Sequence, residues 1–208
     1  MCVGVSTGNV CVVPFLGPSA FGDSLLSPAS NHPISDLTAG QAPHNDPSRA
    51  LVCSADGIGD VHVHAMEEDG TWGHCTTFSV QTHDGTPPLC TSLRMRGARL
   101  YTAYNTGHVR IWDLVSCSLT VQINAHPRFI NAIETHPDGC LFATASEDTT
   151  IALWAFNEGT PDVRVSLVKS IPVQDALLSG VAFCGGFDRT HVACAAYDVA
   201  ALQAWRLD

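Results

Sequence analysis

The chain has few basic residues and contains a single lysine, Lys169. Its ten lysines and arginines stand against 20 aspartates and glutamates, which gives a formal net charge of −10 at pH 7. Binding to nucleic-acid phosphates needs clustered Lys and Arg. The basic cluster formed by Arg94, Arg96 and Arg99 is predicted to lie in a solvated loop. The composition therefore disfavours nucleic acid as a partner and favours an acidic surface suited to basic partners.

The sequence also lacks long apolar runs and paired cysteine motifs. No segment reaches about 18 consecutive apolar residues, and the N-terminus has no basic stretch followed by a long apolar one. The nine cysteines include no C-x-x-C motif, and several lie inside apolar runs. We therefore expect no membrane span, no secretory signal and no disulfide framework. Reduced, buried thiols in a cytoplasmic protein are the expectation.

Short apolar runs separated by turn signals are what the chain has instead. The clearest example is 125–156, which reads AHPRFINAIETHPDGCLFATASEDTTIALWAF. The pattern predicts strands at about 129–134, 141–146, 151–156 and 163–171. The segment His136-Pro137-Asp138-Gly139 predicts a tight turn between the first two of these strands. Four short strands in sequence are typical of an antiparallel all-β unit.

This unit recurs along the chain at spacings of 42 to 51 residues. Trp154 follows Trp112 by 42 residues, and Trp205 follows Trp154 by 51. His64 occupies the corresponding place 48 residues before Trp112. The run GNVCVVPF at 8–15 is the earliest segment that resembles the repeated pattern. A period of about 40–45 residues is typical of propeller blades with four strands each.

The residues SEDTTIALW at 146–154 and HVRIWD at 108–113 resemble the WD-repeat family. The resemblance implies an all-β WD-repeat β-propeller. The length allows an incomplete one, with about four to five blades of a seven-bladed ring. The expected blades are 1–31, 32–80, 88–124, 125–171 and 177–208, and 16–48 is expected to contain long loop insertions. Within that segment, the flanks 27–31 and 38–49 are expected to be exposed loops, either disordered or partner-binding.

The resemblance also implies a structural hydrogen-bonded relay in the best-matched blade. Its members would be His126, Ser146, Asp148 and Trp154. Buried imidazole, carboxylate and indole groups each need partners, so such a network favours one strand register. A hydrolase set of Ser, His and Asp is the alternative, but no G-x-S-x-G elbow surrounds Ser146.

The other repeats depart from the relay pattern. Tyr104 and Thr106 stand where Ser and Asp would precede Trp112, and Tyr197 takes the Ser position before Trp205. We therefore expect those blades to be held together by apolar strand packing alone.

A noncatalytic protein-interaction scaffold is the function that this fold implies. By resemblance, the candidate partner-facing residues are Arg128, Phe129 and Glu147. No catalytic, cofactor-binding or metal site is predicted. The histidines His62, His64 and His74 match no zinc-ligand spacing.

Two alternatives to an independent scaffold stay open. One is a propeller-based enzyme with its site in a central channel, although the predicted innermost strands carry mainly apolar or small residues. The other is a fragment without a function of its own. The sequence begins with a pattern typical of the second strand of a blade and ends on the third strand of another. We therefore expect it to be the C-terminal part of a longer propeller. We also expect self-association through open strand edges.

Overall fold

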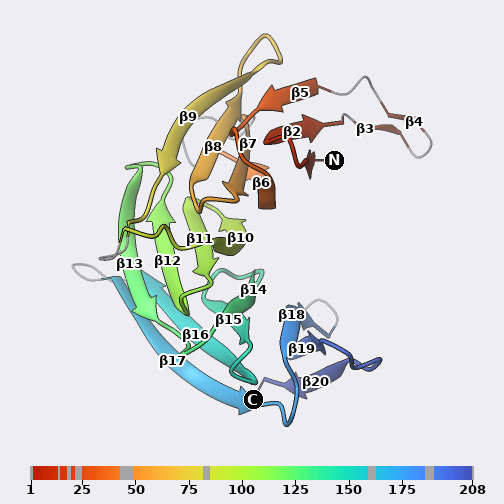
Figure 1. Cartoon of the computed structure of the whole chain (residues 1–208), viewed down its shortest axis with the longest axis vertical. Helices are drawn as coiled ribbons and strands as arrows, with labels where there is room; N and C mark the ends of the chain where they lie inside the picture. The colour runs from red at the N-terminus through yellow and green to blue at the C-terminus, as the bar shows by residue number, and fades with distance from the viewer. Residues whose placement is uncertain are drawn as a thin grey trace. The chain divides into compact units, whose positions relative to one another are not determined.

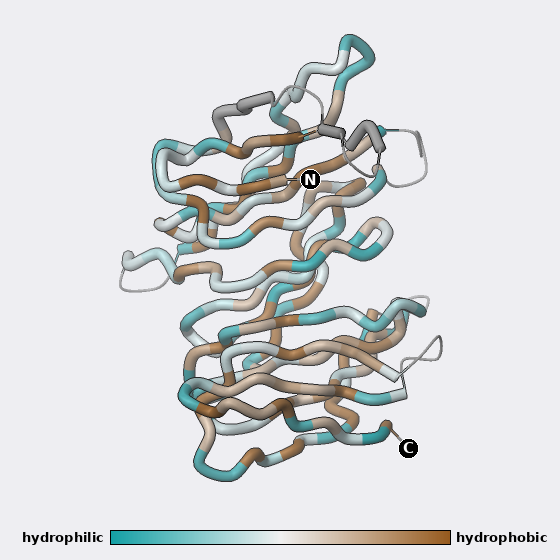
Figure 2. The backbone as a smooth tube through the Cα atoms, turned by 90° about the vertical axis from the view of Figure 1, so that its right-hand side faces the viewer, coloured by the Kyte–Doolittle hydropathy of each residue, from teal (hydrophilic) through white to brown (hydrophobic). Residues whose placement is uncertain are grey.

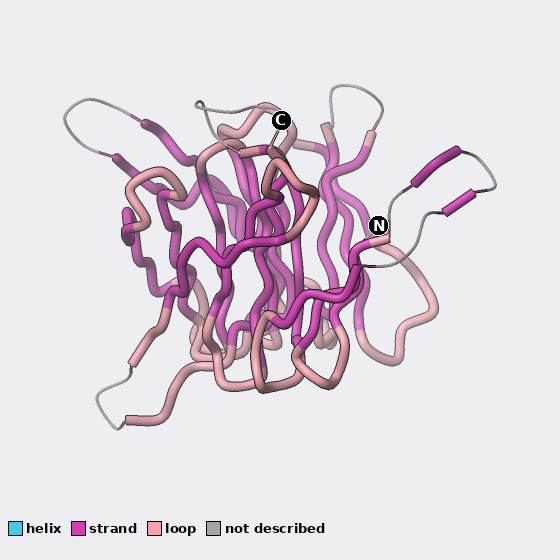
Figure 3. The backbone as a smooth tube through the Cα atoms, turned by 90° about the horizontal axis from the view of Figure 1, so that it is seen from above, coloured by secondary structure: helices cyan, strands magenta, loops and turns pink. Residues whose placement is uncertain are grey.

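The computed structural model describes residues 2–13, 15–17, 20–21, 25–42, 49–81, 85–158, 163–185 and 190–207, with the backbone alone for the described parts of 14–28. Across these ranges the chain consists of strands and turns, with no helix (Figure 3). It divides into two compact units, Met1–Cys90 and Thr91–Asp208. The prediction of an all-β fold is confirmed.

The first unit contains three antiparallel sheets among its described residues (Figure 1). One has the order β1 (Cys2–Gly4), β2 (Asn9–Val12) and β5 (Leu25–Pro28). A small hairpin pairs β3 (Phe15–Gly17) with β4 (Ala20–Phe21). The third sheet has four strands in chain order: β6 (Ile34–Gln41), β7 (Ala50–Asp56), β8 (Val61–Met66) and β9 (Trp72–Phe78).

The sheets of the second unit follow the same meander topology. The first has the order β10 (Cys90–Arg96), β11 (Arg99–Tyr104), β12 (His108–Asp113) and β13 (Ser118–Asn124). The next has β14 (Ile130–Thr135), β15 (Leu141–Ser146), β16 (Thr150–Glu158) and β17 (Val163–Pro172). The last contains β18 (Leu178–Cys184), β19 (His191–Ala196) and β20 (Gln203–Arg206). Four-stranded antiparallel sheets in chain order are the blades that the sequence pattern predicts.

Both expected loops are shorter than predicted. In the 27–31 segment, β5 includes Ser27 and Pro28, which pair with Val10 and Asn9. The segment 38–49 was expected to be an exposed loop, but β6 continues through Gln41. Thr38 pairs with Cys53 and Gln41 with Ala50, so the apolar strand β7 supplies backbone partners that extend its neighbour. Residues 43–48, together with 18–19 and 22–24 of the predicted insertion, lie outside the described residues.

The second strand of each four-stranded sheet is the most buried one. Strand β15 is buried at five of its six positions, whereas β17 is mostly exposed. Figure 2 shows hydrophobic residues along the extended stretches of the backbone and hydrophilic ones at many of its turns. A strand covered on both faces reads as a continuous apolar run rather than an alternating one, which is why LFATAS contains no charge.

Two apolar clusters hold the second unit together. One includes Tyr101, Ile111, Phe142 and Trp154, from the sheets β10–β13 and β14–β17. The other joins β14–β17 to β18–β20, and its members include Ala143, Leu153, Leu178, Phe183 and Val192. Each sheet therefore stabilises the next by burying side chains between facing surfaces.

The outermost strands carry a β-bulge at a repeated place. The register shifts opposite His64, Trp112 and Trp154, which leaves one extra residue in each of β9, β13 and β17. A bulge twists a strand and interrupts its free edge. These edges are therefore poorly suited to pairing with a second copy, and self-association through strand edges stays a prediction.

Candidate functional site

The turn between β15 and β16 carries a buried chain of hydrogen bonds. The Trp154 indole N–H donates to the Thr144 hydroxyl over 3.1 Å, and that hydroxyl lies 2.7 Å from His126 Nε2. On the other side of the ring, His126 Nδ1 lies 2.7 Å from Asp148 Oδ2. With the proton on His126 Nδ1, every donor in this series of hydrogen bonds has an acceptor. The structure thus brings together three of the four predicted relay residues.

The hydroxyl in the relay belongs to Thr144 rather than to Ser146. In the register of β15 and β16, Trp154 lies opposite Phe142, so Thr144 is its diagonal neighbour on the same face. Ser146 is four residues beyond Phe142, roughly 13 Å along the strand. Its hydroxyl instead donates to the Phe129 carbonyl and accepts from the Asp148 backbone N–H. Ser146 therefore shapes the turn.

The same indole–hydroxyl pair occurs in the preceding sheet, which corrects the expectation of apolar packing alone. Trp112 lies opposite Leu100, and its indole N–H donates to the buried Thr102 hydroxyl over 3.0 Å. Both threonines precede their tryptophan by ten residues. That spacing is a usable sequence signal, because it follows from a three-residue connection between two paired strands.

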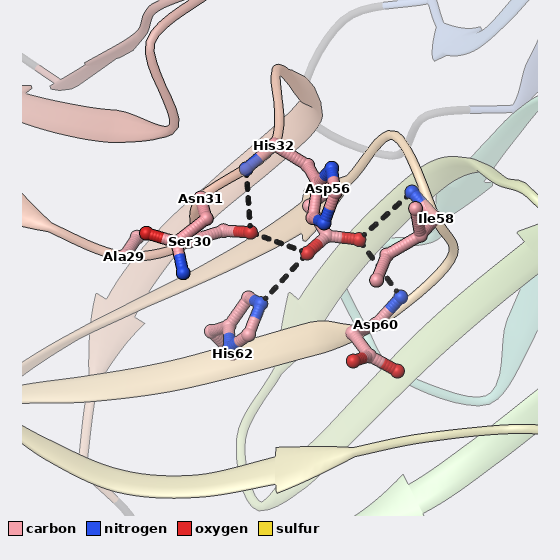
Figure 4. Close-up of a pocket in the computed structure, with 8 residues that line it drawn as sticks. All are labelled: Ala29, Ser30, Asn31, His32, Asp56, Ile58, Asp60 and His62. Atoms are coloured by element: carbon pink, nitrogen blue, oxygen red, sulfur yellow. Dashed lines mark hydrogen bonds and ion pairs between the residues drawn. The ribbon is translucent and has the colours of Figure 1, made fainter.

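A polar pocket of about 410 Å³ lies in the first unit, at the β7–β8 turn (Figure 4). Its centre is Asp56, whose side chain is 1 % exposed. Oδ2 accepts from the Ser30 hydroxyl over 2.5 Å and lies 3.1 Å from His62 Nε2, while Oδ1 accepts from the backbone N–H groups of Ile58 and Asp60. The carboxylate is therefore surrounded by hydrogen-bond partners from three segments.

This arrangement does not suit nucleophilic catalysis. A serine nucleophile needs its hydroxyl hydrogen-bonded to a base such as imidazole. Here Ser30 and His62 both converge on the same carboxylate oxygen. His62 is further bound to Thr77 through Nδ1 at 3.1 Å. The Ser, His and Asp of this pocket thus form a hydrogen-bonded network centred on the Asp56 carboxylate.

The neighbouring histidines do not form a metal centre. Within the described ranges, no group of three or more His, Cys, Asp or Glu side chains is arranged to hold a metal ion. His64 is 5 % exposed, and its ring centroid lies 5.3 Å from that of His74. Burial, together with His74 and His62, lowers the pKa of His64 to about 4. His64 is therefore neutral at pH 7 and fills the place that tryptophan takes in the later repeats.

Acid is expected to destabilise the protein through Asp56 and Asp148. Burial alone would raise the pKa of each carboxyl. Hydrogen bonds from Ser30 and His62 nevertheless lower the pKa of Asp56 below the ordinary 3.8. Hydrogen bonds from Thr150 and His126 do the same for Asp148. The ionised carboxylates of Asp56 and Asp148 therefore add to the free energy of unfolding above pH 3.8, and this stabilisation is lost as the pH falls through each lowered pKa.

Urea unfolding between pH 7 and pH 2.5 measures the loss. The variants Asp56→Asn and Asp148→Asn should show a shallower decline below pH 4, and an unchanged slope would contradict the assignment.

A second pocket, the Glu147 pocket, lies in the second unit and has a volume of about 460 Å³. Its lining comes from the start of β14, the β15–β16 turn, the beginning of β18 and the end of β19: Asn131, Glu147, Leu177, Leu178, Ser179 and Tyr197. Leu178 is fully buried and forms the floor, whereas Leu177 is 45 % and Tyr197 69 % exposed. The pocket therefore has an apolar base with large exposed side chains at its rim.

The three predicted partner-facing residues lie together beside this pocket. Glu147 lines it, and its backbone N–H donates to the Phe129 carbonyl over 2.9 Å. The Arg128 guanidinium forms an exposed ion pair with Glu147 over 3.3 Å, and Phe129 is 38 % exposed. Their contact with a partner stays a prediction. Sequence reasoning missed Leu177 and Tyr197, because no motif marks an exposed apolar residue in a turn.

Among the described residues, no helix has the length and hydropathy needed to span a bilayer. The WDR54 family model matches residues 1–206. The chain is 27 % identical over 205 residues to WD repeat-containing protein 54 of Mus musculus, covering 96 % of this chain and 58 % of that protein. To the protein of the same name in Homo sapiens it is 25 % identical over 211 residues, covering 98 % and 59 %.

A local similarity extends to a ribosomal protein. Over 51 residues the chain is 37 % identical to Small ribosomal subunit protein RACK1y of Oryza sativa subsp. japonica, which covers 24 % of this chain and 15 % of that protein. The chain spans less than three fifths of the length of its mouse relative. The family match covers nearly the whole chain, so the chain belongs to the WDR54 family of WD-repeat proteins.

Proposed function

We propose that this chain is a noncatalytic protein-interaction scaffold whose Glu147 pocket receives a segment of a partner protein. Membership of a WD-repeat family supports a scaffold in general. The observation that carries the finer proposal is the rim of the pocket, where Leu177 and Tyr197 are 45 % and 69 % exposed around an apolar floor. Large exposed apolar side chains around a concavity are typical of protein-docking sites.

The backbone around the pocket is held in place before any partner binds. Tyr197 N–H donates to the Leu177 carbonyl over 2.8 Å, which links the β19 end to the β18 start. The Asn131 amide donates to the Leu178 carbonyl, also over 2.8 Å, which links β14 to the same segment. A preorganised site loses little conformational entropy on binding, so a small apolar contact yields useful affinity.

An enzyme is the weaker proposal for this chain. The polar pocket around Asp56 holds the residue types of a hydrolase, but its serine hydroxyl is bound to the carboxylate. No cofactor is part of the proposal. We also propose a cytoplasmic location, which the nine free cysteines support because reducing compartments keep thiols unpaired.

Substituting the rim is expected to abolish partner binding without unfolding the protein. The test selects binding peptides with the full chain from a random dodecamer library displayed on phage. Their affinities for Leu177→Ser/Tyr197→Ser are then measured by biolayer interferometry and should be at least about tenfold weaker.

The matched control is Leu167→Ser/Val168→Ser, which removes two side chains that are 53 % and 57 % exposed on β17. Its peptide affinities should equal those of the wild type, and circular dichroism should show both variants folded. Selected peptides that bind the rim variant as tightly as the wild type would contradict the proposed function.

A further inference from the structure

The Glu147 pocket has an apolar floor that suits an aliphatic or aromatic side chain. Leu178 belongs to the apolar cluster between β14–β17 and β18–β20, so the floor is continuous with the core. A volume of about 460 Å³ is within the range of ordinary ligand sites. A Leu, Met or Phe side chain placed there would bury apolar surface against the exposed side chains of Leu177 and Tyr197.

The pocket carries one acidic side chain, that of Glu147. Asp175 and Asp198 lie within two residues of lining residues in the chain, and both are exposed. The chain as a whole carries a formal charge of −10. A cationic partner segment would be attracted during the encounter and an acidic one repelled.

The Glu147 carboxylate is available for exchange between cations. Its ion pair with Arg128 spans 3.3 Å, with the two side chains 31 % and 60 % exposed. Exposed pairs of this kind contribute only about 0–1 kcal/mol. An arriving arginine or lysine therefore competes with Arg128 for Glu147 at little cost.

We infer that the Glu147 pocket binds a basic, apolar protein segment, in which a Leu, Met or Phe side chain enters the pocket and an Arg or Lys within three residues of it pairs with Glu147. This inference rests on the proposed function and adds the chemistry of the partner. Arg128 then acts as an intramolecular competitor for the partner's cation.

The phage selection with the full chain tests the inference through the sequences that it enriches. We expect dodecamers with a large apolar residue and an Arg or Lys within three positions. Their affinity should fall about fivefold in Glu147→Gln and rise about twofold in Arg128→Ala, because the first variant removes the anion and the second its competitor. Raising NaCl from about 50 to 300 mM should weaken binding to the wild type more than binding to Glu147→Gln. The control Glu68→Gln, which removes an exposed carboxylate from the first unit, should change nothing.

The outcomes separate this inference from the proposed function. Enriched peptides without basic residues, bound equally well by Glu147→Gln but poorly by Leu177→Ser/Tyr197→Ser, would overturn the inference and leave the proposed function in place. Selected peptides that bind Leu177→Ser/Tyr197→Ser as tightly as the wild type would overturn both the inference and the proposed function. A selection that enriches no sequence would also overturn both.

Discussion

Replacing Trp154 with alanine is expected to lower the free energy of unfolding by about 3–5 kcal/mol. The indole is 8 % exposed and stacks on Phe142, with ring centroids 6.1 Å apart. Its removal leaves a cavity in the cluster between the sheets β10–β13 and β14–β17 and takes a donor from the Thr144 hydroxyl. Urea unfolding followed by circular dichroism measures the effect.

The matched control for this prediction is Trp205→Ala. Trp205 is only partly buried and packs at the border of the second cluster, so its loss should cost clearly less. A smaller change, Trp154→Phe, keeps most of the apolar volume and removes the hydrogen bond; we expect a cost of about 1–2 kcal/mol. Equal losses for Trp154→Ala and Trp205→Ala would show that the indole of Trp154 has no special role.

Gly107→Ala is the second substitution with a large expected effect. Gly107 lies in the β11–β12 turn with φ of +79°, and a Cβ there would stand 2.0 Å from the His126 carbonyl oxygen. That backbone is fixed, because the N–H groups of Ala125 and His126 both donate to the Gly107 carbonyl over 3.0 Å. The turn or the segment leading to β14 must therefore move, and we expect a loss of at least about 3 kcal/mol from the positive φ and the steric clash together.

Gly97→Ala separates the two causes. Gly97 has φ of +56°, and a Cβ there would meet nothing within 4 Å. Gly97→Ala should lower the free energy of unfolding by only about 1–2 kcal/mol, the penalty for placing alanine in the left-handed conformation. If thermal unfolding gives the same loss for both variants, the close approach at Gly107 is not rigid and the two hydrogen bonds from 125 and 126 do not fix the turn.

The all-β architecture of short antiparallel strands could be predicted because its signals are local. Alternating apolar residues, Asp-Gly turns and the spacing of Trp112 and Trp154 each act within a few residues or repeat along the chain. The resemblance to the WD-repeat family implied the relay, and the structure brings together His126, Asp148 and Trp154. The relay differed at Ser146 because the side chain that meets an indole is set by cross-strand register, which places Thr144 diagonal to Trp154.

The pockets were beyond what the sequence could predict. The Glu147 pocket combines the starts and ends of four strands that are up to 66 residues apart in the chain, and no local pattern brings Asn131 and Tyr197 together. The network around Asp56 is similar, since Ser30 reaches the carboxylate from the β5–β6 connection and His62 from strand β8. Residues that meet only through the packing of sheets leave no periodic trace in the sequence.

Hydrogen–deuterium exchange of the full chain, alone and saturated with a selected basic peptide, tests the central claim most directly. We predict slower exchange of the backbone amides at 128–131, 147–148, 177–179 and 197–198, which surround the Glu147 pocket. Slower exchange confined to other segments, such as 29–32 and 56–62 around Asp56, would contradict the claim and place the binding surface elsewhere.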